Sequence, residues 1–216
     1  MTVERILFVC TGNTCRSPMA EGLFHMEAKR RGIRGEARSA GVFAAQGMPI
    51  SDHAAEVLRE RGAEAKAASQ ALTRELIEWA DLILTMTASH KRQVIGMFPD
   101  AADKTFALKE FAALDGETGA LLKEREKLIA ELQIKQALNQ PVSEEEKNRI
   151  LEIERQLPNF DIADPIGGDL DEYRRCAAEI EEAVGKAIEK LAGGPGSAAP
   201  SPGSSGPDAP APGTPG

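Results

Sequence analysis

Two residues near the start of the chain, Cys10 and Arg16, have the types and the spacing of a phosphoryl-transfer site. A cysteine thiolate is a strong nucleophile, and the planar guanidinium group of an arginine can hold two phosphate oxygens at once. The short loop between them consists of Thr11, Gly12, Asn13, Thr14 and Cys15. Backbone N–H groups in so short a loop can converge on one anion. The spacing therefore predicts a phosphate-binding loop, continuing to Ser17, that carries its own nucleophile.

The residues around this loop predict a strand before it and a helix after it. Residues 6–9 are apolar, as in a buried strand, and Pro18 suits the first turn of a helix, where its missing N–H has no partner. Gly12 and Asn13 tolerate the positive φ angles of a tight loop. A helix N-terminus and Arg16 both favour negative charge, so we expect the Cys10 thiol to be ionised at neutral pH. An isolated Cys-x5-Arg pair is more often a buried thiol and a solvated arginine, but here the whole context is present.

The stretch VCTGNTCRSPMAE at residues 9–21 closely resembles the signature of the low-molecular-weight protein phosphatases. That family also uses an Asp-Pro pair late in the chain, which Asp164 and Pro165 match, and the resemblance covers residues 3–111 and 160–191. It implies that Asp164 is the general acid. The reaction itself also requires a carboxyl group, because a carboxyl that protonates the leaving group can afterwards deprotonate the attacking water. An isolated Asp-Pro pair would more often be a turn.

The resemblance also implies roles for residues that support the loop. Asn13 would brace the loop through Ser39, and the Ser17 hydroxyl would donate a hydrogen bond to the Cys10 thiolate. His53 and His90 are interpreted as surface or helix-start histidines without a role, because the loop already supplies nucleophile, anion clamp and acid. No metal and no cofactor are expected.

The choice of substrate depends on Thr11, because the residue after the nucleophile lines the pocket and phosphotyrosine-directed relatives have a larger apolar residue there. Threonine resembles the bacterial protein-arginine phosphatase branch, in which Phe43 would form one wall of the pocket. A hydroxyl can bond to the guanidinium side of phosphoarginine, whereas an isoleucine cannot. Ile166, in the pocket wall beside the acid, departs from the aromatic residues of both branches. Phosphotyrosine phosphatase is the alternative, with Thr11 merely a compatible loop residue.

The composition predicts one globular enzyme domain. The chain has 216 residues, of which 42% are hydrophobic and 28% charged, with a formal net charge of −8. It shows no basic stripe typical of nucleic-acid binding, no signal peptide, and no apolar run near the roughly 20 residues that span a bilayer. We therefore expect a cytoplasmic protein whose partners are phosphorylated proteins, without nucleic acid or membrane.

The three cysteines do not make a disulfide framework. Cys10 and Cys15 share one loop, so Cys15 could trap a sulfenic acid on Cys10 as a disulfide, which predicts redox-sensitive activity. The alternative is that Cys15 is a small buried loop residue. Cys176 is interpreted as structural. Arsenate reductases share the fold but relay a disulfide through further cysteines, and the absence of any between Cys15 and Cys176 argues against that activity.

The periodic segments predict a three-layer αβα sandwich with a four-stranded parallel sheet. Apolar segments at 6–9, 37–42, 82–86 and 105–108 alternate with helical patterns at 17–31, 51–62, 73–79, 88–97 and 170–191. Strands separated by helices form parallel sheets covered on both faces. The Cys10 loop would then lie at the carboxyl end of the first strand, where such sheets bind ligands, and Asp164 would reach the same edge.

One phosphatase domain is expected at residues 1–192. Two segments do not belong to its pattern of alternating strands and helices. Residues 115–158 predict an inserted antiparallel helical hairpin, with a capping box from Ser143 to Glu146. It could be a lid, a dimerisation arm or a docking surface for protein partners; the alternative is a solvated decoration. A non-enzymatic phosphoprotein-binding module that uses the hairpin is the competing class of function. Residues 193–216, rich in Pro, Gly, Ser and Ala, predict a disordered tail.

Overall fold

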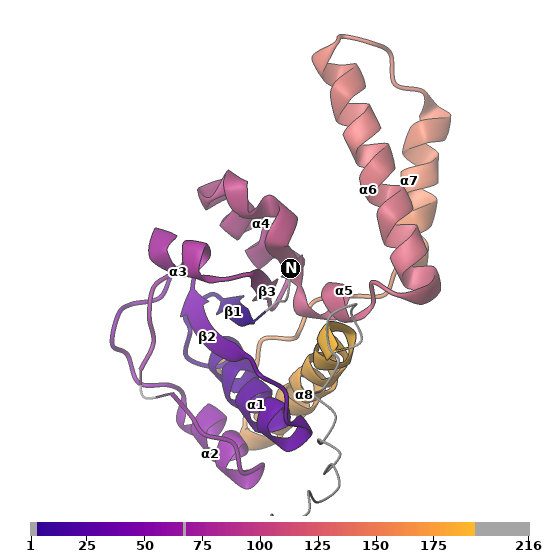
Figure 1. Cartoon of the computed structure of the whole chain (residues 1–216). Coiled ribbons are helices and arrows are strands. Elements are labelled where there is room, and N and C mark those ends of the chain that lie inside the picture. The colour runs from indigo at the N-terminus through magenta and orange to yellow at the C-terminus, as the bar shows by residue number, and fades with distance from the viewer. Residues whose placement is uncertain (1–3, 67, 193–216) are drawn as a thin grey trace, which may run out of the picture.

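The computed structural model describes residues 4–66 and 68–192, and it confirms the predicted α/β sandwich (Figure 1). Its parallel sheet has the strand order β2-β1-β3-β4. The strands are β1 (Arg5–Cys10), β2 (Glu36–Gly41), β3 (Leu82–Thr85) and β4 (Thr105–Ala107). The tail predicted at 193–216 lies outside the described residues.

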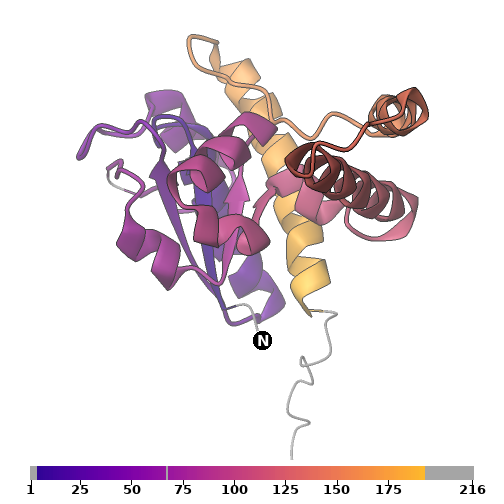
Figure 2. The same ribbon diagram turned by 90° about the horizontal axis from the view of Figure 1, so that it is seen from above.

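Helices cover both faces of the sheet (Figures 1 and 2). They are α1 (Arg16–Arg31), α2 (Asp52–Glu60), α3 (Arg74–Trp79), α4 (Ala88–Met97), the 3₁₀ helix η1 (Pro99–Lys104), α5 (Leu108–Ala112), α6 (Gly116–Ala137), α7 (Glu144–Gln156) and α8 (Leu170–Ala192). Helices α1, α2 and α8 pack together on one face, and α3 and α4 lie on the other. The alternation of β1 explains both layers: Phe8 and Cys10 belong to the first core, and Leu7 and Val9 belong to the second.

The register of the central strands brings β2 against the loop that follows β1. Cys10 pairs with Gly41 at the ends of the two strands. A Cβ atom on Gly41 would lie 2.4 Å from the Thr11 carbonyl oxygen and 2.9 Å from the Asn13 backbone nitrogen. Only glycine therefore allows this close approach of β2 to the loop.

The predicted strand at 105–108 is too long, and a helix was missed after it. β4 ends at Ala107, and Leu108 begins α5, whose Leu108 and Phe111 are buried three residues apart. The Glu110 side chain accepts a hydrogen bond from the Ala107 backbone N–H at 3.0 Å and so caps this helix. A short apolar run fits a strand and a buried helical turn equally well, so the sequence alone did not separate them. Other predicted boundaries differ by one or two residues, as is usual at element ends.

Helices α6 and α7 form a hairpin that projects from the sandwich beside α5 (Figures 1 and 2). Its second helix begins with the predicted capping box: Ser143 Oγ accepts from the Glu146 N–H at 3.2 Å, and the Glu146 carboxylate accepts from the Ser143 N–H at 3.0 Å. This reciprocal pair of bonds fixes the first turn of α7.

Ion pairs join the base of the hairpin to the sandwich. Arg125 of α6 lies 3.8 Å from the buried carboxylate of Glu110, and Lys190 of α8 lies 2.7 Å from Asp115, which precedes α6. Farther along the hairpin, Arg149 binds Glu124 of the other helix at 2.8 Å. The roles of lid, dimerisation arm and docking surface all stay predictions.

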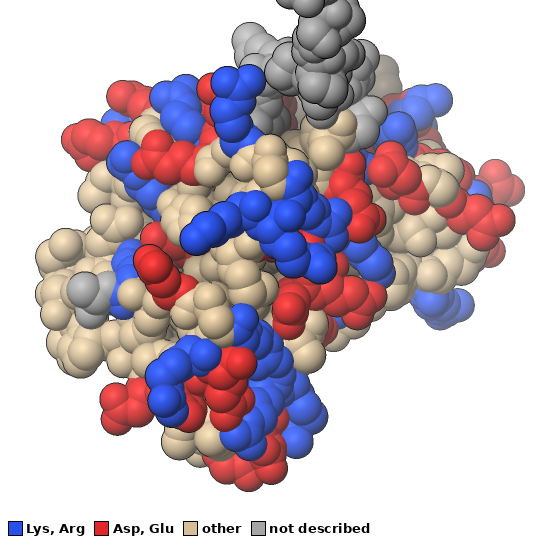
Figure 3. All heavy atoms as spheres, turned by 60° about the horizontal axis from the view of Figure 1, so that its bottom comes forward, with Lys and Arg blue, Asp and Glu red and all other residues tan. Residues whose placement is uncertain are grey.

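The surface mixes both signs of charge. On the face shown in Figure 3, basic and acidic side chains are interspersed over the helices. Many of them are paired, as in the contacts of Arg174 with Glu60 and of Arg61 with Glu181. Among the described residues, no helix combines the length and the apolar character needed to cross a bilayer.

Candidate functional site

The loop between β1 and α1 is built to hold an anion. Cys10 is the last residue of β1 and Arg16 the first of α1, and both are buried. Helix α1 begins without a capping side chain and without an acidic residue in its first turn, so its N-terminal N–H groups favour an anion. Asn13 takes the expected positive φ of 54°, but Gly12 does not.

Hydrogen-bond donors surround the Cys10 sulfur. Its Sγ atom lies 3.0 Å from Ser17 Oγ and accepts the Asn13 backbone N–H at 3.3 Å. The Ser17 hydroxyl itself accepts from Asn13 Nδ2 at 2.9 Å, so its own proton is shared between the sulfur and the Ala40 carbonyl oxygen, which lies 3.4 Å away. These contacts fix the position of the sulfur in the loop.

The Asn13 side chain fastens the loop to the rest of the domain. Its Nδ2 donates to Ser39 Oγ at 2.8 Å as well as to Ser17, which is the bracing contact expected from the sequence. Its Oδ1 accepts from Lys66 Nζ at 3.0 Å and from the Gln70 N–H at 2.8 Å. Every donor and acceptor direction of the amide is thus used, which fixes its orientation.

Lys66 was missed by the sequence analysis. Its Nζ also donates to the Ser39 carbonyl oxygen at 3.0 Å and lies 3.8 Å from the Glu21 carboxylate. Burial lowers the pKa of Lys66. The residue belongs to an irregular segment after α2, where no periodicity or motif marks it, so no signal in the sequence could have identified it.

The structure brings Asp164 to the loop. Arg16 Nη2 donates to Asp164 Oδ2 at 2.5 Å, and Arg16 Nη1 donates to the Ile162 carbonyl oxygen at 3.2 Å. The Ile162 N–H binds the Met86 carbonyl oxygen at 2.9 Å, which ties this segment to the end of β3. The Asp164 side chain is 43% exposed, so its carboxylate is accessible to solvent.

His90 is a helix-start histidine, as expected, and lies in the first turn of α4. It is only 5% exposed, so it is not a surface residue. Its Nε2 atom lies 2.8 Å from Thr11 Oγ1 and its Nδ1 atom 2.9 Å from Thr87 Oγ1. Burial, together with the positive charge of Arg16, lowers the pKa of His90 to about 4, so the imidazole is neutral at pH 7.

Two exposed apolar side chains stand on backbone segments that are tied to the reactive groups. Phe43 is 73% exposed, and its N–H donates to the Thr11 carbonyl oxygen at 3.0 Å. Ile166 is 72% exposed, and its N–H donates to Asp164 Oδ1 at 3.2 Å. Their roles as walls of a substrate pocket stay predictions.

The other two cysteines differ in their surroundings. Cys15 Sγ lies 3.2 Å from the Tyr173 hydroxyl, and burial raises the pKa of Tyr173 to about 12, so this hydroxyl keeps its proton. The ring of His53 packs edge-on against Tyr173. Burial raises the pKa of Cys176 to about 12, and its thiol lies 3.6 Å from the Ala163 carbonyl oxygen. An inert buried thiol agrees with a structural role for Cys176.

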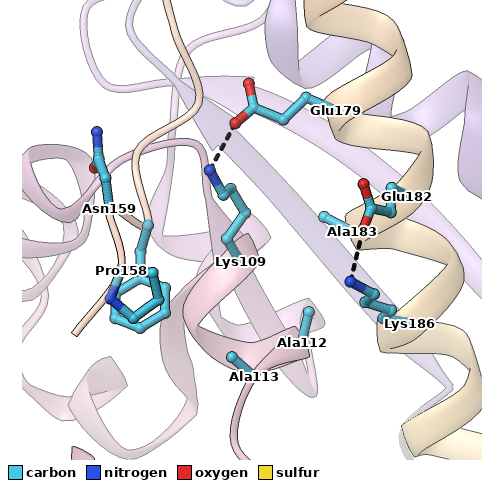
Figure 4. Close-up of a pocket in the computed structure, with 10 residues that line it drawn as sticks. Lys109, Ala112, Ala113, Pro158, Asn159, Glu179, Glu182, Ala183 and Lys186 are labelled. Carbon is cyan, nitrogen blue, oxygen red and sulfur yellow. Dashed lines mark hydrogen bonds and ion pairs between the residues drawn. The ribbon is translucent and has the colours of Figure 1, made fainter. Parts of the chain in front are cut away.

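A cavity of about 470 Å³ lies apart from this constellation, between α5, α8 and residues 158–160 (Figure 4). None of the residues predicted for the site lines it. Its lysines are paired, Lys109 with Glu179 and Lys186 with Glu182, each at 2.6 Å. Across residues 4–66 and 68–192, no group of three or more His, Cys, Asp or Glu side chains is arranged to hold a metal ion.

Comparisons with known proteins agree with this geometry. The family model described as low molecular weight phosphotyrosine protein phosphatase matches residues 5–122. The chain is 40% identical over 188 residues to the protein-arginine-phosphatase of Geobacillus stearothermophilus, covering 87% of this chain and 95% of the relative. It is 36% identical over 186 residues to that of Bacillus subtilis, covering 86% and 95%. Among solved structures, a cysteine-to-serine mutant of the YwlE arginine phosphatase with a phosphorylated active-site serine is similar with a TM-score of 0.66 and 33% identity, over 88% of this chain and 97% of that one.

Proposed function

Because this chain belongs to the low molecular weight phosphotyrosine protein phosphatase family, we propose that it hydrolyses phosphoarginine on proteins through a phosphocysteine intermediate. The observation that carries the choice of phosphoarginine is the hydroxyl of Thr11, held directly after the nucleophile by a buried histidine. The two curated relatives named as protein-arginine phosphatases support the same choice. We place this activity in the cytoplasm, where thiols stay reduced.

In the first step, the Cys10 thiolate attacks phosphorus. The S–P bond forms as the P–N bond breaks, and protonated Asp164 gives its proton to the departing guanidino nitrogen. Arg16 and the loop N–H groups stabilise the charge on the phosphoryl oxygens in the transition state. The products of this step are the free arginine side chain, a phosphocysteine and an Asp164 carboxylate.

In the second step, water hydrolyses the phosphocysteine. The Asp164 carboxylate takes a proton from the water as its oxygen attacks phosphorus and the S–P bond breaks. Inorganic phosphate leaves, and the Cys10 thiolate is regenerated with Asp164 protonated again. The Ser17 hydroxyl, 3.0 Å from the sulfur, stabilises the negative charge that returns to it.

The ion pair between Arg16 and Asp164 gives the acid a defined starting place. A phosphoryl group in the loop would compete for the same guanidinium nitrogen that Asp164 now binds at 2.5 Å. Arg16 prefers bidentate contacts with phosphate oxygens, so substrate binding would release Asp164 toward the leaving group.

Substrate choice is proposed to depend on three side chains at the mouth of the loop. The Thr11 oxygen would accept a hydrogen bond from a guanidinium N–H, which phosphotyrosine lacks. Phe43 and Ile166 would pack on the flat guanidinium plane and the aliphatic stem of the arginine. A β-branched aliphatic wall at Ile166 offers no aromatic face for a tyrosine ring.

Replacing Thr11 by isoleucine is expected to shift the preference from phosphoarginine toward phosphotyrosine. The ratio of kcat/KM for matched phosphoarginine and phosphotyrosine peptides should fall by about 10- to 100-fold, because one hydrogen bond is lost and apolar surface is gained. The measurement is phosphate release from both peptides by the wild type and the variant. Thr14→Val, elsewhere in the same loop, is the control and should affect both substrates alike.

A wild-type preference for phosphotyrosine would overturn the phosphoarginine assignment and leave the family activity on phosphotyrosine as the function. A ratio that Thr11→Ile does not change would show that Thr11 is only a compatible loop residue. Since specificity is a ratio of the two constants, neither result depends on how active the preparation is.

We also propose that Cys15 protects Cys10 from irreversible oxidation. Peroxide would oxidise the Cys10 thiolate to a sulfenic acid, and attack by the Cys15 sulfur would form a disulfide with loss of water. After peroxide and then dithiothreitol, Cys15→Ser should recover several-fold less activity than the wild type, because sulfenic acid that is not trapped proceeds to sulfinic acid. Activity assays before and after reduction test this. Cys176→Ala is the control, and equal recovery in Cys15→Ser would contradict the proposal.

A further inference from the structure

The buried side chain of His90 connects the start of α4 to the hydroxyl of Thr11, the residue that follows Cys10. His90 contacts Thr87 with Nδ1 at 2.9 Å and Thr11 with Nε2 at 2.8 Å. Thr87 is the N-cap of α4, so one end of this chain of side chains is anchored in a helix terminus. The other end, Thr11, lies exposed at the loop. The position of the ring is therefore set by the fold and not by the substrate.

The hydrogen bonds assign the protons of this chain. The Thr87 hydroxyl oxygen accepts the backbone N–H of His90 at 3.1 Å, so its own proton is available for Nδ1. A neutral imidazole has one donor and one acceptor nitrogen, and His90 is neutral at pH 7 because burial and the charge of Arg16 disfavour the imidazolium. We take Nδ1 as the acceptor of this Thr87 proton, which makes Nε2 the protonated nitrogen that donates to Thr11 Oγ1.

This bond selects one orientation of the Thr11 hydroxyl. An unconstrained threonine side chain samples several staggered rotamers, and its hydroxyl proton rotates to suit its neighbours. With Nε2–H directed at one lone pair, Thr11 Oγ1 keeps a second lone pair for the substrate. Phosphoarginine presents guanidinium N–H donors beside the phosphorus, whereas phosphotyrosine presents an ester oxygen and ring carbons.

We propose that His90 is a positioning residue for substrate choice: it holds the Thr11 hydroxyl so that its free lone pair accepts a guanidinium N–H of phosphoarginine. This inference rests on the proposed phosphoarginine phosphatase activity. His90 takes no proton in the reaction and acts only through Thr11. Its removal should therefore weaken phosphoarginine turnover and leave phosphotyrosine turnover nearly unchanged.

A purely structural role for His90 makes a different prediction. If the ring only packs α4 against the sheet, its loss should lower activity on both substrates equally and should not depend on the residue at position 11. A double-mutant cycle separates the two roles, because coupling appears only between groups that act together.

The experiment measures kcat/KM for matched phosphoarginine and phosphotyrosine peptides in the wild type, Thr11→Val, His90→Leu and the double variant. Thr11→Val removes only the hydroxyl and keeps the branched shape. Each single variant should lower the ratio of the two constants by about 3- to 10-fold, the effect of one neutral hydrogen bond. The double variant should lower this ratio no further than Thr11→Val alone does.

His90→Gln supplies a second variant if His90→Leu does not fold, since its side chain keeps an N–H donor. It should restore part of the phosphoarginine preference, with thermal unfolding as the check on folding. The inference fails if the wild type prefers phosphoarginine but His90→Leu and His90→Gln lower kcat/KM equally for the two peptides. It also fails if His90→Leu lowers the ratio of the two kcat/KM values as much in the Thr11→Val background as in the wild type. A wild-type preference for phosphotyrosine overturns the proposed function as well, so the two failures are distinguishable.

Discussion

Replacing Cys10 by serine should reduce kcat/KM for any phosphopeptide by at least about 10⁴-fold, because a serine hydroxyl at this position is not ionised and has no base beside it. Binding should survive, since Arg16, the loop N–H groups and helix α1 remain. The introduced hydroxyl can also keep the bond to Ser17. Phosphate release measures the loss of turnover, and calorimetric titration with a phosphopeptide measures the binding that remains. Intact-mass analysis would detect any phosphoryl group trapped on the introduced serine.

Cys176→Ala is the matched control, because it removes a thiol that lies near Ala163 and not in the loop. It should keep activity within a few fold of the wild type. A wild type that binds phosphopeptides but releases no phosphate would identify a non-enzymatic binding module and overturn the phosphatase assignment. Turnover that persists in Cys10→Ser would exclude the phosphocysteine mechanism.

Replacing Asp164 by asparagine should lower kcat/KM for phosphoarginine peptides by about 10²- to 10⁴-fold, the usual effect of removing a general acid. The guanidino nitrogen is a poor leaving group unless it is protonated. p-Nitrophenyl phosphate has a good leaving group, so its kcat/KM should fall much less. Its kcat should still fall, because the amide cannot deprotonate the water that hydrolyses the phosphocysteine. Initial rates on both substrates, with a burst assay for phosphoenzyme, test these expectations.

Asp169→Asn is the control for a carboxylate changed to an amide in the same region. Asp169 accepts the Glu172 N–H at 2.9 Å at the start of α8, and asparagine caps helices equally well. Both substrates should be turned over normally by this variant. If Asp164→Asn lowers kcat/KM equally for the good and the poor leaving group, Asp164 does not act as the acid and its contact with Arg16 is only structural.

The part of the site that is contiguous in sequence could be predicted well, because local geometry dictates it. A strand, a five-residue loop and a helix follow each other from β1 to α1, and this stretch holds the proposed nucleophile, the proposed anion clamp and Ser17. The alternation of strands and helices likewise predicted the parallel sheet. The end of β4 could not be predicted, since Leu108 fits a strand and a buried helical turn alike.

Contacts over long sequence separations could be predicted only where the family resemblance supplied them. Asp164 and Ser39 were expected near the loop on that basis. No sequence motif marks Lys66, which lies 53 positions from its loop partner Asn13. None marks His90, which lies 79 positions from its loop partner Thr11. A lysine and a histidine in polar surroundings are ordinarily solvent-exposed, and nothing in the residues alone argued otherwise.

The sequence by itself thus determined the parallel α/β sheet and predicted a phosphate-binding loop with a cysteine nucleophile at the end of its first strand. Only the tertiary structure decided what surrounds that loop: the cation of Lys66 behind Asn13, the neutral ring of His90 on Thr11 and the Tyr173 hydroxyl at Cys15. The physical reason is that the parallel crossovers bring the carboxyl ends of β1, β2 and β3 to one edge of the sheet. Side chains from distant segments meet there, and burial then fixes their protonation and their partners.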